Sequence, residues 1–214
     1  MKLSPENLQW MIDTQREWHE RMRPASTHLG QHLFDVPAKL TQASVNDARL
    51  FADRVEALKF FPRGGRVAEV GTQAGWYAQR MVEMLAPDEL HLFDLDFSLL
   101  EKDRPELGRL SEVTLHTGDS SEMLGRFPDQ YFDWIYVDGD HNIEGVKRDS
   151  AVAVKKVKAD GIVVFNDYTP WSIMELNDYG VMPVVNALLQ NGEWKVAYFT
   201  FHQHMYCDLA IRRV

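Results

Sequence analysis

The sequence predicts a single α/β domain whose sheet is doubly wound and mostly parallel. From Arg66 onward, short apolar runs alternate with amphipathic stretches, which is typical of strands separated by helices. Glycine and aspartate follow the apolar runs, where a parallel sheet places its ligand-binding turns. The chain has 214 residues, of which 45% are hydrophobic, so one domain can bury a sizeable core. We expect residues 61–214 to form this core and residues 1–60 an N-terminal helical cap.

Two helices are expected ahead of the sheet. Ser4-Pro5-Glu6 combines a capping residue with a proline at the first helical position, and this helix should run to about Met22. Pro24–Pro37 then has the composition of a loop. A second helix is predicted over Ser44–Phe60, because Pro62 and two glycines follow it. Both helices can cover the ligand edge of the sheet.

Strands and helices alternate over the rest of the chain. The expected strands are Arg66–Val70, Leu90–Leu95, Val113–Thr117, Phe132–Val137, Gly161–Phe165, Lys195–Phe201 and Met205–Arg212. The expected helices are Trp76–Leu85, Ser98–Leu110 with a capping box at Ser98 and Glu101, a helix from Ser120, Ile143–Val157 and Val181–Gln190. The last two strands are joined by His202–His204, a link too short for a parallel crossover, so they should pair antiparallel.

The composition disfavours several classes of partner. The formal net charge is −9, which disfavours binding to nucleic acid or to an anionic membrane surface. No apolar run approaches the roughly 18 residues of a membrane-spanning helix, and Met1–Trp10 lacks the apolar core of a signal peptide. The single cysteine, Cys207, cannot form an internal disulfide and is expected to be a small buried hydrophobe. A cytoplasmic location is the default expectation.

A glycine-containing loop follows the first expected core strand. It reads Glu69-Val70-Gly71-Thr72-Gln73-Ala74-Gly75, with the spacing Gly-x-x-x-Gly. Glycines let the backbone turn tightly and approach a ligand, and the helix behind them offers free N–H groups to an anionic group. The dinucleotide fingerprint Gly-x-Gly-x-x-Gly and the P-loop are both absent from the sequence. The loop is either a ligand cradle or an ordinary strand-to-helix turn.

Acidic residues follow the second and third expected strands. Asp94 lies 23 residues after Gly71, close to the distance at which a carboxylate accepts hydrogen bonds from ribose hydroxyls. The alternative for Asp94 is a solvated loop carboxylate, and Asp96 can cap the next helix. Asp119 can accept a hydrogen bond from an adenine amino group and also cap the helix from Ser120, because capping uses one carboxylate oxygen.

Two carboxylates are expected to face each other after the fourth and fifth strands. Asp138 and Asp167 follow strands that are neighbours in the usual order of such a sheet. Close carboxylates repel, so a proton, a cation or a basic group should relieve them. Mg²⁺ suits these oxygen ligands, and Asn166 can add a carbonyl oxygen. The alternative is that one aspartate hydrogen-bonds the loop and no ion binds.

Together these stretches resemble the class I S-adenosylmethionine-dependent methyltransferases, and among them small O-methyltransferases of the catechol and macrocin types. The resemblance covers about Arg66 to the C-terminus. It implies a Rossmann-like, seven-stranded sheet with an antiparallel final strand, and a cofactor whose methionine part lies on the glycine loop. The residues expected at S-adenosyl-L-methionine are Glu69, Gly71, Thr72, Gln73, Gly75, Asp94, Leu95, Asp119, Ser120 and Asp138.

The resemblance also suggests a catalytic set. Metal-dependent members look similar at Asp138 and Asp167, which makes Asp138, Asn166 and Asp167 the expected ligands of a Mg²⁺ ion. Those members usually carry another Asp, Glu or Asn beside the second carboxylate, whereas its neighbours here are Asn166 and Tyr168. Asp138, His141 and Asp167 are the expected catalytic residues, with His141 as a base, a metal ligand or a loop histidine bonded to backbone.

The expected function is methyl transfer from S-adenosylmethionine to a hydroxyl of a small molecule, with no nucleic-acid or membrane partner. The segment Tyr168–Gly180, with Tyr168, Trp171 and Tyr179, can wall an acceptor pocket together with Pro24–Pro37, or form a lid that packs on itself. Three alternatives stay open: a non-catalytic adenosine-ligand module, a macromolecular acceptor, and a dinucleotide-dependent oxidoreductase, which the missing fingerprint disfavours. The sequence does not decide between a monomer and a homodimer.

Overall fold

The computed structural model describes residues 38–172, 174, 175, 177–202 and 204–214, together with positions 5, 6, 9, 10, 12–14, 16, 17 and 20. These N-terminal positions are all helical, as predicted for the helix that begins at Pro5. The expected loop Pro24–Pro37 lies outside the described residues. Among the residues that are described, no helix is long and apolar enough to cross a membrane.

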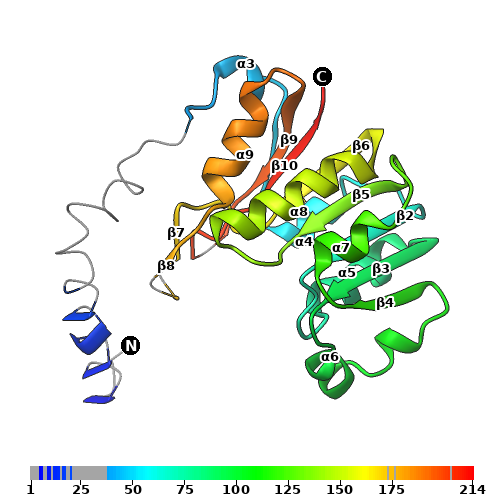
Figure 1. Cartoon of the computed structure of the whole chain (residues 1–214), viewed down its shortest axis with the longest axis horizontal. Helices are drawn as coiled ribbons and strands as arrows, with labels where there is room; N and C mark the ends of the chain where they lie inside the picture. Colours follow the sequence, from blue (N-terminus) through cyan, green and yellow to red (C-terminus); the bar gives the residue numbers. More distant parts are fainter. Residues whose placement is uncertain are drawn as a thin grey trace.

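An eight-stranded sheet forms the centre of the molecule (Figure 1). Its strands, in spatial order, are β1 (Arg49–Phe51), β9 (Trp194–Thr200), β10 (Leu209–Arg213), β6 (Val157–Phe165), β5 (Phe132–Val137), β2 (Arg66–Val70), β3 (Glu89–Asp94) and β4 (Val113–Thr117). β10 runs antiparallel to both of its neighbours, and the other pairs are parallel. The predicted mostly parallel sheet with an antiparallel C-terminal strand is confirmed, with eight strands in place of seven.

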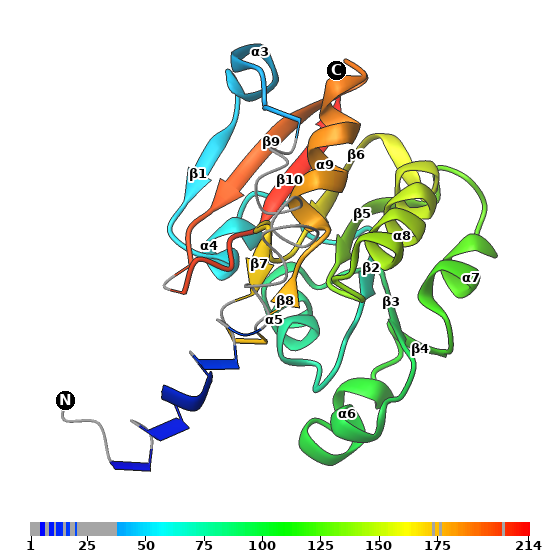
Figure 2. The same cartoon turned by 60° about the vertical axis from the view of Figure 1, so that its left-hand side comes forward.

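Helices cover both faces of this sheet (Figures 1 and 2). One face carries α4 (Arg54–Leu58), α5 (Trp76–Leu85) and α6 (Ser98–Asp103), and the other carries α7 (Ser120–Gly125), α8 (Ile143–Lys156) and α9 (Val181–Gln190). Successive side chains of β5 point to opposite faces of the sheet and so contribute to both hydrophobic cores. Trp134 and Tyr136 pack on the α4–α6 face, and Ile135 and Val137 pack on the α7–α9 face. A small hairpin of β7 (Trp171–Ser172) and β8 (Asn177–Asp178) precedes α9.

The second predicted helix, Ser44–Phe60, is wrong. The segment forms α3 (Gln42–Val45), then β1, then α4, and β1 pairs in parallel with β9 in the register Leu50↔Phe199. Asp53 caps α4 by accepting a hydrogen bond from the backbone N–H of Glu56 at 2.8 Å, so a new helix begins after the strand. Pairing with the sheet edge satisfies the backbone groups of β1 and outweighs the local helix preference. Part of the expected helical cap therefore belongs to the sheet.

The helix predicted over Ser98–Leu110 is also shorter than expected. α6 ends at Asp103, ahead of Pro105, and a 3₁₀ turn spans Leu107–Arg109. The predicted capping box at Ser98 is wrong, because Asp96 instead accepts hydrogen bonds from the backbone N–H and the hydroxyl of Ser98, at 2.8 and 2.7 Å. Asp96 thus organises the start of α6 from outside the helix.

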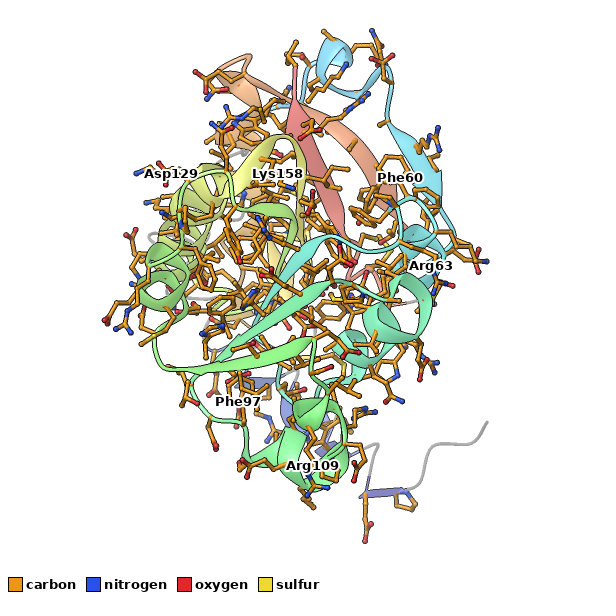
Figure 3. All side chains as sticks on the ribbon, turned by 90° about the vertical axis from the view of Figure 1, so that its right-hand side faces the viewer. Phe60, Arg63, Phe97, Arg109, Asp129 and Lys158 are labelled. Carbon is orange, nitrogen blue, oxygen red and sulfur yellow. The ribbon has the colours of Figure 1, made fainter. Side chains whose placement is uncertain are left out.

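An aromatic cluster fastens β1 and α4 to the sheet. Phe51 and Phe60 both meet Tyr198 of β9 edge-on, with ring centroids 5.4 and 5.5 Å apart (Figure 3, where Phe60 is labelled). Phe61 stacks on Trp134 of β5 at 4.2 Å. Such aromatic pairs contribute about 0.5–1.5 kcal/mol each beyond the burial of their area. The position of α4 over the sheet is therefore well defined, which matters because α4 carries Arg54.

Candidate active site

A cavity of about 520 Å³ opens at the carboxyl ends of β2, β3, β4 and β5. It is lined by Gly71, Gln73, Phe93, Asp94, Leu95, Gly118, Asp119, Ser120, Asp138, Gly139, Asp140, His141, Arg148, Asp149 and Glu175. Its place at the sheet edge and its volume suit a nucleoside-sized ligand. Most residues expected at the cofactor line this cavity, whereas Glu69, Thr72 and Gly75 lie outside its wall.

The glycine loop after β2 depends on its glycines. Gly71 has a φ of +83°, and a Cβ added there would lie 1.9 Å from the carbonyl oxygen of Asp138. The loops after β2 and β5 thus touch through their backbones, and a larger residue at position 71 would separate them. Gly75 also has a positive φ, +73°, and packs against Leu100 and Leu107, so it supports the loop without lining the cavity.

Two polar side chains lie beneath the glycine loop. Glu69 and Thr72 are 2% and 5% exposed, and neither Glu69 Oε2 nor Thr72 Oγ1 has a hydrogen-bond partner among the described residues. Burial raises the pKa of Glu69 well above its ordinary value, and the nearby Asp138 acts in the same direction. Unpartnered buried polar atoms are uncommon in proteins, and a ligand group or water on the loop would satisfy them.

Asp94 lies at the end of β3, where the ribose contact was expected. Its Oδ2 accepts a hydrogen bond from the backbone N–H of Gln73 at 2.7 Å, and its Oδ1 accepts one from Asp96 at 3.2 Å. A carboxylate offers about four lone-pair positions, so Asp94 can hold the glycine loop and still accept further hydrogen bonds. Leu95, which is 75% exposed, follows it on the cavity wall.

Asp119 has the divided role that the sequence suggests. Its Oδ1 caps α7 by accepting hydrogen bonds from the backbone N–H of Glu122 at 2.9 Å and from the hydroxyl of Ser121 at 2.6 Å. Its Oδ2 has no partner within the described part of the chain and so stays available to a ligand. Ser120, next to it, donates a hydrogen bond to Asp149 of α8 at 2.8 Å. Asp149 also lines the cavity, although nothing in its sequence context singled it out.

Asp138, Asp167 and His141 come together at the ends of β5 and β6. The two strands are neighbours, and His141 Nε2 lies 3.5 Å from Asp138 Oδ1 and 3.6 Å from Asp167 Oδ2. The His141 ring stacks on Tyr179, with centroids 4.5 Å apart and planes at 15°. Nε2 is buried and has no hydrogen-bond partner among the described residues. Asp167 has a φ of +54°, an unusual backbone for a residue other than glycine, and one that aspartate tolerates better than most.

Burial sets the protonation of this cluster. It lowers the pKa of His141, while Asp167 acts in the opposite direction. It raises the pKa of Asp138 well above its ordinary value, and the charge of Asp167 adds to the effect. It also raises the pKa of Asp167, where His141 and Arg54 oppose it. The lowered pKa favours a neutral imidazole at neutral pH, and the raised pKa values of Asp138 and Asp167 favour protonation of the carboxyl groups, which reduces the repulsion between them.

Arg54 supplies the positive charge that two close carboxylates require. Its Nη2 lies 2.6 Å from Asn166 Oδ1 and 3.7 Å from Asp167 Oδ1, and it forms an ion pair with Asp208 at 3.1 Å. Burial alone would lower the pKa of Arg54, but Tyr136, Asp208 and the site carboxylates outweigh it and the pKa is raised. Burial raises the pKa of Asp208 to about 7, with Arg54 opposing. Sequence analysis missed Arg54 and Asp208, since neither follows a predicted motif.

The expected metal ligands Asp138, Asn166 and Asp167 do not fit a divalent ion as they are arranged. The carbonyl oxygen of Asn166 accepts a hydrogen bond from Arg54, and its amide nitrogen donates one to Asp138 at 2.5 Å. A divalent cation beside the guanidinium would face a like charge. Among the described residues, no group of three His, Cys, Asp or Glu side chains is arranged to hold a metal ion.

The expected aromatic wall is realised only in part. Tyr168 points away from the cavity, because its hydroxyl donates a hydrogen bond to Asn186 of α9. Tyr179 packs on His141. The β7–β8 hairpin, which lies between Tyr168 and Tyr179 in the sequence, brings Glu175 to the cavity. The other proposed wall, Pro24–Pro37, lies outside the described residues.

A second cavity, of about 450 Å³, has Arg54 in its wall. It is lined by Ala52, Asp53, Arg54, Val55, Trp76 and His202. These residues come from the β1–α4 segment, the start of α5 and the connection between β9 and β10. Arg54 lines this second cavity, and its hydrogen-bond partner Asn166 in turn donates a hydrogen bond to Asp138, which lines the first cavity.

Comparisons with known proteins agree with this arrangement. A family model described as a methyltransferase domain matches residues 68–168, from β2 through the turn after β6. That span contains the glycine loop, Asp94, Asp119, Asp138, His141 and Asp167. A search of curated protein sequences finds no match.

Solved structures with the same fold are distant in sequence. An S-adenosylmethionine-dependent methyltransferase from Mesorhizobium loti has a TM-score of 0.54 and 18% identity, covering 73% of this chain and 96% of that one. The pyocyanin biosynthetic protein PhzM has a TM-score of 0.55 and 18% identity, covering 75% and 54%. The Bacillus subtilis tRNA methyltransferase TrmK has a TM-score of 0.56 and 10% identity, covering 77% and 67%. At these identities the likeness concerns the fold.

The fold, the glycine loop at its cavity and the family match define a class of protein. The match of residues 68–168 to a methyltransferase domain, together with the fold, supports a class I S-adenosylmethionine-dependent methyltransferase. The same findings support an enzyme that uses S-adenosylmethionine, and the unpartnered polar atoms at the glycine loop and the free oxygen of Asp119 fit such a ligand.

Proposed function

We propose that this methyltransferase acts on a hydroxyl group of a small molecule, with His141 as the base. The observation that carries the proposal is the buried Nε2 of His141, which has no hydrogen-bond partner among the described residues and belongs to a residue that lines the first cavity. A lowered pKa keeps this nitrogen unprotonated at neutral pH and ready to accept a proton. A hydroxyl acceptor is the group that needs such a base.

The cofactor supplies, when bound, a methyl group on a sulfonium that already carries the positive charge of the leaving group. We assign its binding to Glu69, Gly71, Thr72, Gln73, Gly75, Asp94, Leu95, Asp119, Ser120 and Asp138. Glu69, Thr72 and Gly75 are the members of this set that do not line the cavity, and Glu69 and Thr72 are buried; the others line the cavity wall. The chain itself then has to position the acceptor and remove a proton.

His141 and Asp167 can perform the proton transfer together. His141 Nε2 accepts the proton of the acceptor hydroxyl, and Asp167, 3.6 Å away, stabilises the imidazolium that forms. Tyr179 holds the ring by stacking on it. Burial and the charge of Asp167 raise the pKa of Asp138 well above its ordinary value, which disfavours an anionic Asp138 that would compete for the proton.

The second cavity is the proposed acceptor site. Trp76 is 44% exposed and presents a planar apolar face, and Arg54 and His202 add polar groups. Arg54, in the wall of this cavity, also lies 3.7 Å from Asp167 and so connects the cavity to one member of the proposed proton-transfer pair. The net charge of −9 favours a small molecule over nucleic acid as the acceptor.

Calorimetry and a transfer assay test the proposal in two stages. The purified chain should bind S-adenosylmethionine and its demethylated product, and should not bind NAD. Methyl transfer from radiolabelled cofactor should then be seen with at least one member of a panel of small phenols, catechols and sugars. Transfer to total RNA but to no small molecule would overturn the acceptor class. Cofactor binding without transfer to any acceptor would favour a non-catalytic module.

A further inference from the structure

A single nitrogen atom of Arg54 is surrounded by oxygen atoms. Nη2 lies 2.6 Å from Asn166 Oδ1, 3.1 Å from Asp208 Oδ1, 3.3 Å from the carbonyl oxygen of Tyr206 and 3.7 Å from Asp167 Oδ1. These four atoms come from the end of β6 and from the segment that leads into β10. Two carboxylates, an amide oxygen and a backbone carbonyl are the donor types that a hard divalent cation takes in proteins.

The oxygen shell is built into the fold. Asp208 is 1% exposed, and its Oδ1 accepts no hydrogen bond within the described residues. That oxygen instead forms the ion pair with Arg54. Tyr136 orients the shell from below, because its hydroxyl lies 3.1 Å from Asp208 Oδ2 and 3.3 Å from Asn166 Oδ1. The hydroxyl of Tyr136 therefore holds Asn166 and Asp208 near each other independently of the guanidinium.

Arg54, by contrast, comes from a different part of the chain. It is the first residue of α4, whose N-terminus is capped by Asp53, and its carbonyl oxygen accepts a hydrogen bond from Tyr77 at 3.3 Å. Its side chain reaches residue Asn166 across 112 positions of sequence. It also forms part of the wall of the second cavity, so removing its side chain would join that space to the oxygen shell.

We infer that the guanidinium of Arg54 takes the place of a divalent cation, and that the oxygen atoms of Asn166, Asp167, Asp208 and Tyr206 form a latent metal site which Arg54 closes. The guanidinium keeps its charge at all relevant pH values, so it balances the carboxylates without an ion from solution. Removing it leaves two carboxylates and two neutral oxygens around a space that water and an ion can enter. This inference does not depend on which acceptor is methylated.

Mn²⁺ binding tests the inference without any turnover. Free Mn²⁺ is measured by electron paramagnetic resonance during titration of the wild type, Arg54→Ala, Arg54→Lys and Arg80→Ala. Arg54→Ala should bind one Mn²⁺ per chain at least about tenfold more tightly than the wild type, and Mg²⁺ or Ca²⁺ should compete for it. Arg54→Lys keeps a cation and should behave as the wild type. Arg80 pairs with Glu83 on the exposed side of α5, so Arg80→Ala is a matched control for loss of an arginine.

A double variant tests whether the Mn²⁺ ion binds to these oxygen atoms and not elsewhere on the protein. Arg54→Ala combined with Asp208→Asn should lose the Mn²⁺ binding that Arg54→Ala gained. If Arg54→Ala does not fold without metal, Mn²⁺ should restore its circular dichroism and raise its melting temperature, while leaving the wild type unchanged. Failure of Mn²⁺ to bind or restore Arg54→Ala would overturn the inference, and so would wild-type chain that binds one Mn²⁺ as tightly as Arg54→Ala.

Discussion

The backbone N–H of Gln73 donates a hydrogen bond to Asp94 Oδ2 at 2.7 Å, which ties the glycine loop after β2 to the end of β3. The carboxylate proposed to hold the ribose therefore also fixes the loop proposed to hold the methionine part. The two halves of the proposed cofactor site thus share one side chain, and the loop cannot move away from β3 without losing a charge-assisted hydrogen bond.

Replacing Asp94 with Ala should weaken binding of the demethylated cofactor at least about tenfold. Hydrogen bonds to charged groups are worth about 1.5–3 kcal/mol each, and this change removes those to the ribose and the one to Gln73. Calorimetry measures the affinity. Asp96→Ala is the control, because Asp96 serves the start of α6 and should mainly reduce stability. Equal losses of affinity in both variants would place the ribose contact elsewhere.

Replacing Gly71 with Ala should reduce the unfolding free energy by about 2 kcal/mol or more and abolish cofactor binding. The new Cβ meets the backbone of Asp138 at 1.9 Å, and the positive φ adds about 1 kcal/mol of strain. Gly192→Ala is a matched control, since Gly192 has a similar φ of +77° but no atom within 4 Å of its added Cβ. Urea unfolding of the two variants separates the steric conflict from the backbone strain. Similar losses of unfolding free energy in both variants would mean that the glycine loop can shift to accommodate the Cβ and would contradict the prediction.

Replacing His141 with Gln should lower kcat about 100-fold or more while leaving cofactor affinity within about twofold of the wild type. The base must be unprotonated, and burial lowers its pKa, so kcat should stay constant through neutral pH. It should fall only as the pH drops through a value below the ordinary histidine pKa of about 6.5. A pH profile of kcat with the acceptor that the panel identifies checks this, and an inflection above about pH 7.5 would contradict the assignment.

Replacing Glu69 with Gln should flatten the dependence of stability on pH. Because the pKa of Glu69 is raised on folding, the folded chain binds more protons than the unfolded chain between about pH 4.3 and the folded pKa. This contribution is complete below about pH 4.3 and is lost as the pH rises through the folded pKa. The wild type should therefore lose more stability than Glu69→Gln between about pH 5 and about pH 8. Parallel melting-temperature curves for the two proteins would show that Glu69 ionises normally.

Local pattern was sufficient for the elements that carry the proposed cofactor site. The bounds of β2 and α5 were predicted to the residue, because an apolar run, a glycine loop and an amphipathic stretch follow each other without interruption. β1 was missed for a physical reason. Its three residues are half or fully exposed, so no apolar alternation marks them, and pairing with β9 alone makes Arg49–Phe51 a strand.

The sequence by itself determined the parallel sheet, the antiparallel end and the polar residues at each strand terminus, because these features depend on neighbours within a few positions. Only the tertiary structure decided how the charges at the edge are balanced. Arg54 meets Asn166 across 112 residues and Asp208 from yet another segment, and no local spacing encodes such a meeting. Asn166 and Asp167, which suit a metal ion in the sequence, therefore lie beside a guanidinium in the fold, because α4 places Arg54 next to them.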